Sequence, residues 1–366
     1  MHIGIDYRPV SVAPYSGIAR QVKGLEAALA GRCDTQISLF AVVPENHPLR
    51  TRVICPRWTT PLTGLQQPHK RWRFEAGFLP SALKEHNIDL YIATANMGLP
   101  IARKSQNKKS VLLLHDLFQL TENNYHKSRL KAYIYRVLDR LSIAWSVHVA
   151  DQIWCPSLFT AQQVKTRYPH ASSKVRVLPN LVSGFAGSTE SVDQLPSEYW
   201  LLVGTREPRK NIPLFIDVWL KVKKEHPVPD LVFVGDAADF PEYASLPHIV
   251  WLSGITEGQL HFLYLHANYL WQPSYAEGFG LPVIEALSVG TPVITAQGSS
   301  LDEITPPDSY RFDPYSAQDL EKCMLKVLTV PVHNNKKDCI AWAEKYNDIS
   351  YKEHVSTLIS ELMPKC

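Results

Sequence analysis

Residues 269–285 read Tyr269-Leu-Trp-Gln-Pro-Ser-Tyr-Ala-Glu277-Gly-Phe-Gly-Leu-Pro-Val-Ile-Glu285, which is an apolar run, a glycine-rich loop and the start of a helix. Pro282 suits the first turn of that helix, and Gly278 and Gly280 let the backbone come close to a ligand. In open α/β sheets, ligands bind outside the carboxyl ends of the strands. The stretch therefore predicts a strand–loop–helix unit whose loop carries part of a binding site.

The same alternation of short apolar runs and amphipathic stretches extends through both halves of the chain, and it is typical of βαβ units with parallel sheets. We expect strands at His2–Asp6, Ile37–Val43, Leu90–Ala93, Val111–His115, Gln152–Cys155, Val175–Leu178, Trp200–Val203, Asp230–Val234, Ile249–Leu252, Tyr269–Gln272 and Val293–Thr295. We expect helices at Ile18–Ala30, Leu130–Ala150, Ile212–Glu225, Glu257–Ala267, Pro282–Val289 and Ala317–Leu328. A chain of 366 residues exceeds the usual size of one hydrophobic core. These features predict two Rossmann-like domains, residues 1–190 and 191–346, joined by the Gly- and Ser-rich segment Ser183–Pro196 and separated by a deep cleft.

The composition is that of a globular protein, with 45% apolar and 20% charged residues. No apolar run is long enough to span a membrane, and the first residues lack the pattern of a signal peptide. The six cysteines form no CxxC pair, which favours reduced thiols over disulfides or a zinc site. We therefore expect a cytoplasmic protein without a bound metal.

The charge is unevenly distributed. Residues 1–190 carry 24 Lys/Arg against 12 Asp/Glu, whereas the rest of the chain carries 14 against 23. Basic stretches at Lys70–Phe74, Lys108-Lys109 and Lys127–Lys131 place cations beside aromatic and aliphatic residues. This pattern fits peripheral contact with an anionic membrane or a phosphate-bearing partner, or merely a solvated basic face. No nucleic-acid reader motif accompanies it, so we expect no nucleic-acid partner.

A second loop with functional groups is Gly204-Thr-Arg-Glu-Pro-Arg-Lys-Asn211, which lies between a predicted strand and a predicted helix. The fork of Arg209, the point charge of Lys210 and the helix N-terminus suit a diphosphate. The alternative is a polar loop with solvated charges. Glu285 lies about one turn into its helix, where its carboxylate suits a ribose diol, and Glu277 lies nearer the expected reacting centre.

The first half carries weaker signals. Gly17 opens a helix after the first strand and would let a phosphate or acceptor approach the helix N-terminus, but the segment is not a GxGxxG fingerprint. His115 ends a strand and is either a functional group facing the cleft or a structural histidine.

Together these motifs resemble glycosyltransferase family 4, whose members are retaining enzymes with the GT-B fold, in which two Rossmann-like domains face each other across a central cleft. The most specific feature is the family's E-x7-E motif, here Glu277 to Glu285. Supporting segments are Glu207-Pro-Arg-Lys-Asn211, Val234-Gly235-Asp236, Leu252-Ser-Gly254-Ile255-Thr256, Pro179-Asn180 and the final helix, about residues 347–366, which in the family crosses back onto the N-terminal domain.

The resemblance implies roles for these residues. Arg209 and Lys210 would neutralise the donor diphosphate in place of a divalent metal, and Glu285 would hold the ribose. Many members have an arginine where this chain has Thr205, so Arg206 or Arg209 would supply that cation. The remaining implied contacts are Glu277 and the backbone of Gly278, Phe279, Gly280 and Leu281 with sugar and phosphate, Ile255 with the nucleobase, Gly17 with the phosphate, and His115 with the transferred sugar.

The Glu-Pro-Arg-Lys-Asn variant resembles that of bacterial mannosyltransferases of polysaccharide and O-antigen assembly. The resemblance thus implies a retaining hexosyltransferase that needs no cofactor, uses GDP-mannose, and modifies a hydroxyl of a glycan or polyprenyl-diphosphate-linked acceptor on the N-terminal domain, in the cytoplasm or on the inner face of the plasma membrane. UDP-sugars and dTDP-rhamnose remain open as donors. A nucleotide-sugar epimerase and a non-catalytic nucleotide-sugar sensor are the alternative functions.

Overall fold

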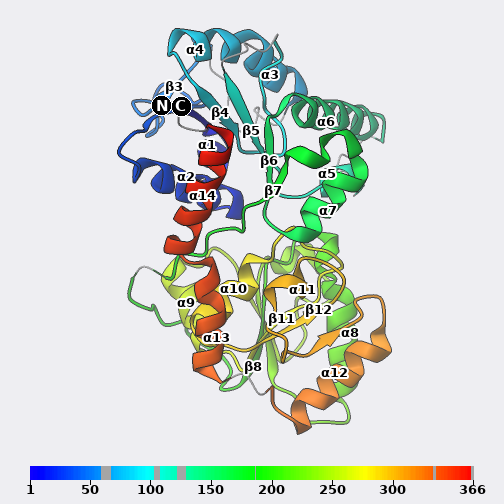
Figure 1. The fold of residues 1–366 in the computed structure, drawn as a ribbon. Coiled ribbons are helices and arrows are strands. Elements are labelled where there is room, and N and C mark those ends of the chain that lie inside the picture. Colours follow the sequence, from blue (N-terminus) through cyan, green and yellow to red (C-terminus); the bar gives the residue numbers. More distant parts are fainter. Residues whose placement is uncertain (59–66, 103–107, 122–128, 186, 333–334, 364–366) are drawn as a thin grey trace. The chain divides into compact units, whose positions relative to one another are not determined.

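The computed structural model describes residues 1–58, 67–102, 108–121, 129–185, 187–332 and 335–363. The chain divides into two compact units, one formed by Met1–Leu181 with Tyr351–Cys366 and the other by Val182–Ser350. Each unit is an α/β layer structure with its own sheet (Figure 1). In the described residues, no helix combines the length and the apolar character needed to cross a membrane.

The sheet of the first unit has seven strands in the order β3-β2-β1-β4-β5-β6-β7, and each neighbouring pair is parallel. Strand β4, next to β1, shows why the apolar runs form strands here. Leu90 and Ile92 of β4 enter one hydrophobic core, whereas Tyr91 and Ala93 enter the core on the opposite face. The strands are β1 (His2–Asp6), β2 (Gln36–Phe40), β3 (Val53–Ile54), β4 (Leu90–Ala93), β5 (Lys109–Leu113), β6 (Gln152–Cys155) and β7 (Val175–Val177).

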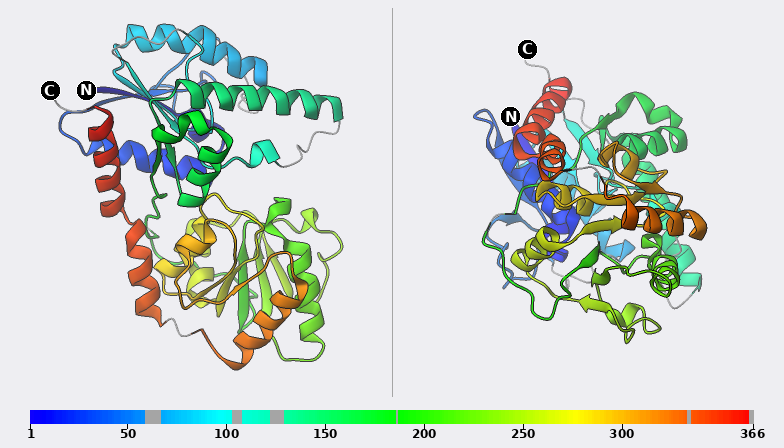
Figure 2. Two further views of the ribbon diagram at one scale, coloured as in Figure 1. Left: turned by 45° about the vertical axis from the view of Figure 1, so that its right-hand side comes forward. Right: turned by 90° about the horizontal axis from the view of Figure 1, so that it is seen from below.

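Helices cover both faces of this sheet (Figures 1 and 2). They are α1 (Arg8–Val12), α2 (Gly17–Ala30), α3 (Pro68–Trp72), a π-helical turn (Arg73–Phe78), α4 (Leu79–Glu85), α5 (Phe118–Thr121), α6 (Arg129–Val149), α7 (Leu158–Arg167) and a 3-10 segment (Pro169–Lys174). The last helix, α14 (Asp348–Leu362), returns to this unit and buries Tyr351, Val355 and Leu358 in the core that contains Ile3 and Ile5.

The sheet of the second unit has six strands in the order β10-β9-β8-β11-β12-β13, again with parallel neighbours. They are β8 (Tyr199–Val203), β9 (Asp230–Val234), β10 (Ile249–Leu252), β11 (Tyr269–Gln272), β12 (Val293–Ala296) and β13 (Arg311–Phe312). The chain runs outward from β8 to β10 and then crosses to β11 on the other side of β8. This reversal creates a topological switch point between β8 and β11, where α/β sheets bind ligands.

The helices of this unit pack in two layers, with α8 against α12 and α10 against α13. They are α8 (Ile212–Lys223), α9 (Glu257–His266), α10 (Leu281–Ser288), α11 (Leu301–Ile304), α12 (Ala317–Thr329) and α13 (Lys336–Ala343), with 3-10 turns at Pro208–Lys210, Ala237–Asp239 and Glu344–Tyr346. Trp200 and Trp271 of the two central strands pack with ring centroids 4.8 Å apart. This core holds β8 and β11 side by side beneath the loops that follow them.

The prediction of two α/β domains with parallel sheets is confirmed. Two differences are local. The two-residue strands β3 and β13 were not predicted, because so short a strand shows no alternation. The segment predicted as a linker packs onto the second unit, where Phe185 stacks on His261 at 4.5 Å between ring centroids. In the predicted basic stretch Lys127–Lys131, residues 127–128 lie outside the described residues.

Candidate functional site

Two loops meet at the switch point of the second unit. One follows β8 and runs from Gly204 to Asn211, and the other follows β11 and leads into α10. A backbone hydrogen bond from Tyr275 N–H to the Arg209 carbonyl, 2.8 Å long, ties the loops together. The segments that the sequence singled out, far apart in the chain, therefore form one site.

Glu277 is the centre of this site. Its carboxylate is buried and accepts Lys210 Nζ at 2.7 Å and Arg209 Nη1 at 2.5 Å. Gln272 Nε2 and Ser274 Oγ donate to the same carboxylate at 2.8 Å each. Burial alone would raise the pKa of Glu277, but the charges of Lys210 and then Arg209 more than offset it and lower the pKa to about 2. Glu277 is therefore ionised throughout the physiological pH range.

The shape of the loop after β8 depends on two residues in the left-handed backbone conformation. Gly204 has φ of +76° and Asn211 has φ of +58°, and the Asn211 side chain donates to the Pro314 carbonyl at 2.9 Å. Between them the 3-10 turn Pro208–Lys210 directs Arg209 and Lys210 to the same carboxylate. Asparagine tolerates this backbone conformation and anchors itself through its amide.

The loop after β11 depends on Gly280. Its φ of +102° is strained for other residues, and a Cβ there would lie 2.8 Å from Ile304 Cδ1. Ser300 Oγ donates to the carbonyls of Glu277 and Phe279 at 2.7 and 2.9 Å. The glycine-containing loop is thus held rigidly against the unit's core.

The second acid of the motif, Glu285, is also buried, one turn into α10. Tyr264 of α9 donates its hydroxyl to Glu285 Oε2 at 2.8 Å. This bond orients the carboxylate, as expected of a buried acid with a positioning role.

The remaining predicted donor residues differ in their surroundings. Phe279 is buried and packs edge-on against Tyr346 at 5.4 Å between ring centroids, which makes it a core residue. Thr205 is buried with no hydrogen-bond partner for its hydroxyl among the described residues. Arg209, rather than the exposed Arg206, supplies the cation beside Glu277. Ile255 follows β10 and is half-buried, and Gly278 and Leu281 flank the α10 N-terminus.

Gly17 and His115 lie in the first unit. Gly17 is the first residue of α2, whose N-cap Ser16 accepts the Ala19 N–H at 3.2 Å. His115 follows β5, and its Nε2 bonds the Thr94 carbonyl at 2.9 Å. Because a carbonyl only accepts, Nε2 carries the proton and Nδ1 is left as an acceptor. Burial lowers the pKa of His115, so the ring is neutral near pH 7.

Two features of the first unit were not foreseen. His115 lines a small pocket with Gln21, Trp154 and Asn180. Directly after β1, buried Arg8 bridges Asp6 at 2.7 Å and Glu75 at 3.1 Å. The signal for this cluster was the Asp-x-Arg pattern at the end of the first strand.

In the second unit the sequence analysis missed Gln272, Ser274 and Tyr264, which hold the two glutamates. The signal for the first two was their polarity at the end of an otherwise apolar strand. In the described residues, no group of three or more His, Cys, Asp or Glu side chains is arranged to hold a metal ion.

Comparisons with known proteins concern the family and the fold of the chain. Residues 190–346 match the family described as glycosyl transferases group 1, and residues 15–183 match Glycosyltransferase Family 4. The chain is 23% identical over 244 residues to O-antigen chain mannosyltransferase B of Escherichia coli, covering 60% of this chain and 61% of that protein. It is 27% identical over 225 residues to O-antigen chain mannosyltransferase RfbU of Salmonella typhimurium, covering 56% and 61%. The aligned part thus spans about three-fifths of the length of each relative.

Among solved structures, sucrose-phosphate synthase from Thermosynechococcus elongatus superposes with a TM-score of 0.74, at 19% identity and with 99% of each chain covered. At this identity the likeness concerns the fold.

Proposed function

The chain is a GT-B glycosyltransferase that joins a Glycosyltransferase Family 4 domain to a glycosyl transferases group 1 domain, and from this premise we propose that it is a retaining hexosyltransferase that moves mannose from GDP-mannose to a glycan hydroxyl. The observation that carries the proposal is the ionised Glu277 with Lys210 and Arg209 at the switch point of the second unit. The names of the two mannosyltransferase relatives support the choice of sugar.

The chemistry rests on the leaving group. When the anomeric C–O bond breaks, negative charge builds on the departing diphosphate, and preorganised cations lower the free energy of that transition state. Glu277 fixes the two cations, and Arg209 also pairs with the more exposed Glu207. The diphosphate would replace Glu207 on Arg209, where the trio of Arg209, Lys210 and Glu277 has a net positive charge. The acceptor hydroxyl attacks from the face that the diphosphate leaves and passes its proton to a phosphate oxygen, so the configuration at the anomeric carbon is retained.

The electrostatics of Glu277 favour this role over two others. A general acid near neutral pH needs a raised pKa, whereas the pKa of Glu277 is lowered to about 2. A covalent nucleophile needs an accessible oxygen, whereas both oxygens of Glu277 accept bonds from cations. Glu277 is therefore assigned to organising the diphosphate site.

The other donor contacts are proposed from the family resemblance. Glu285, oriented by Tyr264, holds the ribose diol, and the backbone of Gly278, Phe279, Gly280 and Leu281 holds sugar and phosphate. Thr205 and the main chain of Ile255 line the nucleotide, and Gly17 approaches the phosphate. Neutral His115 offers Nδ1 to a hydroxyl of the transferred sugar.

The donor is tested by calorimetry with GDP-mannose, UDP-glucose, UDP-GlcNAc, UDP-galactose and dTDP-rhamnose. We expect GDP-mannose to bind most tightly, and tighter binding of a UDP-sugar or dTDP-rhamnose would replace it as the donor. If none of the five binds, the glycosyltransferase proposal itself fails. Activity in EDTA should match activity with Mg²⁺, and a strict metal requirement would contradict the replacement of a metal by Arg209 and Lys210.

The alternative functions give different products. An epimerase would release free epimerised sugar and nucleotide without an acceptor, whereas a transferase needs the acceptor for turnover. A sensor would bind the donor without consuming it, and Glu277→Ala would leave its signalling output largely intact.

The acceptor is proposed to be a glycan or polyprenyl-diphosphate-linked oligosaccharide bound by the first unit at the inner face of the plasma membrane. Support comes from the basic balance of residues 1–190, 24 Lys/Arg against 12 Asp/Glu, because such a surface attracts anionic lipids. Flotation with vesicles of phosphatidylcholine, with and without phosphatidylglycerol, tests this contact. Binding that does not depend on the anionic lipid would contradict it.

A further inference from the structure

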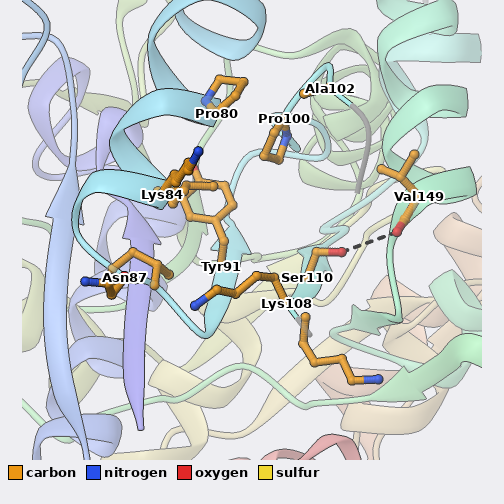
Figure 3. Close-up of a pocket in the computed structure, with 12 residues that line it drawn as sticks. Pro80, Lys84, Asn87, Tyr91, Pro100, Ala102, Lys108, Ser110 and Val149 are labelled. Atoms are coloured by element: carbon orange, nitrogen blue, oxygen red, sulfur yellow. Dashed lines mark hydrogen bonds between the residues drawn. The ribbon is translucent and has the colours of Figure 1, made fainter. Parts of the chain in front are cut away.

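A cavity of about 480 Å³ opens in the first unit, near the amino ends of β4 and β5 (Figure 3). Its volume falls within the range of roughly 300–1,000 Å³ typical of small-molecule sites. Figure 3 shows Pro80 and Lys84 of α4 on one side, Val149 of α6 on the other, and Tyr91 and Ser110 between them.

The cavity lies at the opposite end of strand β5 from His115, the residue of the same unit that is proposed to contact the transferred sugar. It is lined by Lys109, the first residue of β5, whereas His115 follows the carboxyl end of the same strand. The six residue-to-residue steps from Lys109 to His115 span about 20 Å in extended conformation. A molecule in the cavity is therefore not the sugar that is proposed to contact His115.

The rest of the lining has the character of a lipid site. Apolar walls come from Leu83, Ile88 and Val149, and three lysines, Lys84, Lys108 and Lys109, also line the cavity. Lys108 is paired with Asp89 at 3.2 Å. Apolar walls beside several ammonium groups suit a molecule with a hydrocarbon chain and an anionic head.

An exposed apolar stripe on α6 leads to this cavity. Ile134, Leu138, Leu141 and Trp145 are all exposed, and Leu141 keeps 62% of its surface accessible. Val149 continues this helical spacing, four residues after Trp145, and lines the cavity. The Trp145 indole also donates to the carbonyl of Pro100, another lining residue, at 3.2 Å.

We propose that this cavity binds one chain and the phosphate of an anionic membrane phospholipid, with the α6 stripe lying in the membrane interface. The hydrocarbon chain contacts Leu83, Ile88 and Val149, and the head group contacts the lysines. The lipid anchors the enzyme at anionic membranes without being its substrate. The inference rests on the proposed membrane contact, but it does not depend on which sugar nucleotide is the donor.

The test uses the full-length protein and dihexanoyl phosphatidylglycerol below its critical micelle concentration, titrated by calorimetry. We expect saturable binding, with much weaker binding of dihexanoyl phosphatidylcholine and of inorganic phosphate. Equal binding of phosphate would indicate a plain anion site, and absence of binding by phosphatidylglycerol would remove the site. Either result overturns the proposal.

Charge variants test the head-group contacts. Lys84→Ala with Lys109→Ala should weaken phosphatidylglycerol binding about thirtyfold, because each lysine near an anionic lipid contributes roughly a factor of five. The matched control, Lys165→Ala with Lys352→Ala, removes the same charge from exposed positions of the same unit and should change binding less than twofold. Equal effects of the two pairs would show that only overall charge matters and would overturn the proposal.

Cavity variants test the site itself. Leu83→Trp should fill the cavity and abolish binding of the monomeric lipid. Unchanged binding in a folded Leu83→Trp contradicts the proposal. GDP binding in the same samples reports separately on the donor site, so failure of one assignment does not imply failure of the other.

Discussion

Replacing Lys210 by methionine removes a charge and keeps most of the side chain's length. In the structure, Lys210 Nζ lies 2.7 Å from Glu277 Oε1, and only 11% of the lysine side chain is exposed. The substitution lowers the net charge of the trio of Arg209, Lys210 and Glu277 from positive to zero. A hydrogen bond between charged groups contributes roughly 1.5–3 kcal/mol, so GDP affinity should fall about 10- to 150-fold.

The same substitution should leave guanosine binding nearly unchanged, because the nucleoside lacks the diphosphate. Calorimetric titration with GDP and guanosine measures both effects, and Lys224→Met, an exposed lysine just beyond α8, is the matched control. Breaking a buried ion pair costs about 3–5 kcal/mol. We expect Lys210→Met to lower the free energy of unfolding by the lower end of that range, because Arg209, Gln272 and Ser274 still bond Glu277. Equal weakening of GDP and guanosine would refute the phosphate role.

Three further predictions concern the same unit. The lowered pKa of Glu277, about 2 against 4.5, gives stability that is complete above pH 4.5 and is lost as the pH falls toward 2. The free energies of unfolding of wild type and Glu277→Gln, measured with denaturant, should therefore differ by about 3 kcal/mol more at pH 6 than at pH 2. A difference that does not depend on pH would contradict the ion pairs of Glu277. Gly280→Ala forces a side chain into φ of +102° and should lower the free energy of unfolding by about 1–3 kcal/mol. Gly184→Ala, where an added Cβ meets nothing within 4 Å, should not lower it, and equal melting temperatures for the two variants would disprove the strain. Tyr264→Phe leaves Glu285 without its 2.8 Å bond and should weaken GDP binding about fivefold while 2′,3′-dideoxy-GDP binds as before. A loss that is the same for both nucleotides would argue against a ribose contact.

The parallel sheets were predictable because buried parallel strands are continuous apolar runs, and those runs are visible in the sequence. Phe279 illustrates the limit of such inference. The resemblance implied a donor contact for the Phe279 backbone, which stays a prediction, but the sequence did not show that the Phe279 ring packs against Tyr346 from the far end of the unit. That tertiary contact leaves no mark in the local sequence.

The environment of Glu277 could be predicted only in part. The motif placed an acid after β11 and cations after β8, and switch-point topology implied that they are neighbours. The pairing of both cations with one buried carboxylate depends on the fold of two loops about 60 residues apart. The lowered pKa of Glu277 follows from that pairing. The spacing of residues within either loop does not predict it.

The return of α14 to the first unit has a consequence for biosynthesis. Tyr351, Val355 and Leu358 complete a core whose other members include Ile3 and Ile5, yet all of Val182–Ser350 lies between Leu181 and this helix in the chain. At about 5–20 residues per second of translation, the first unit waits roughly 10–30 s on the ribosome with this apolar face uncovered. Nascent chains arrested before residue 351 should therefore be captured by chaperones and cut by protease in the first unit.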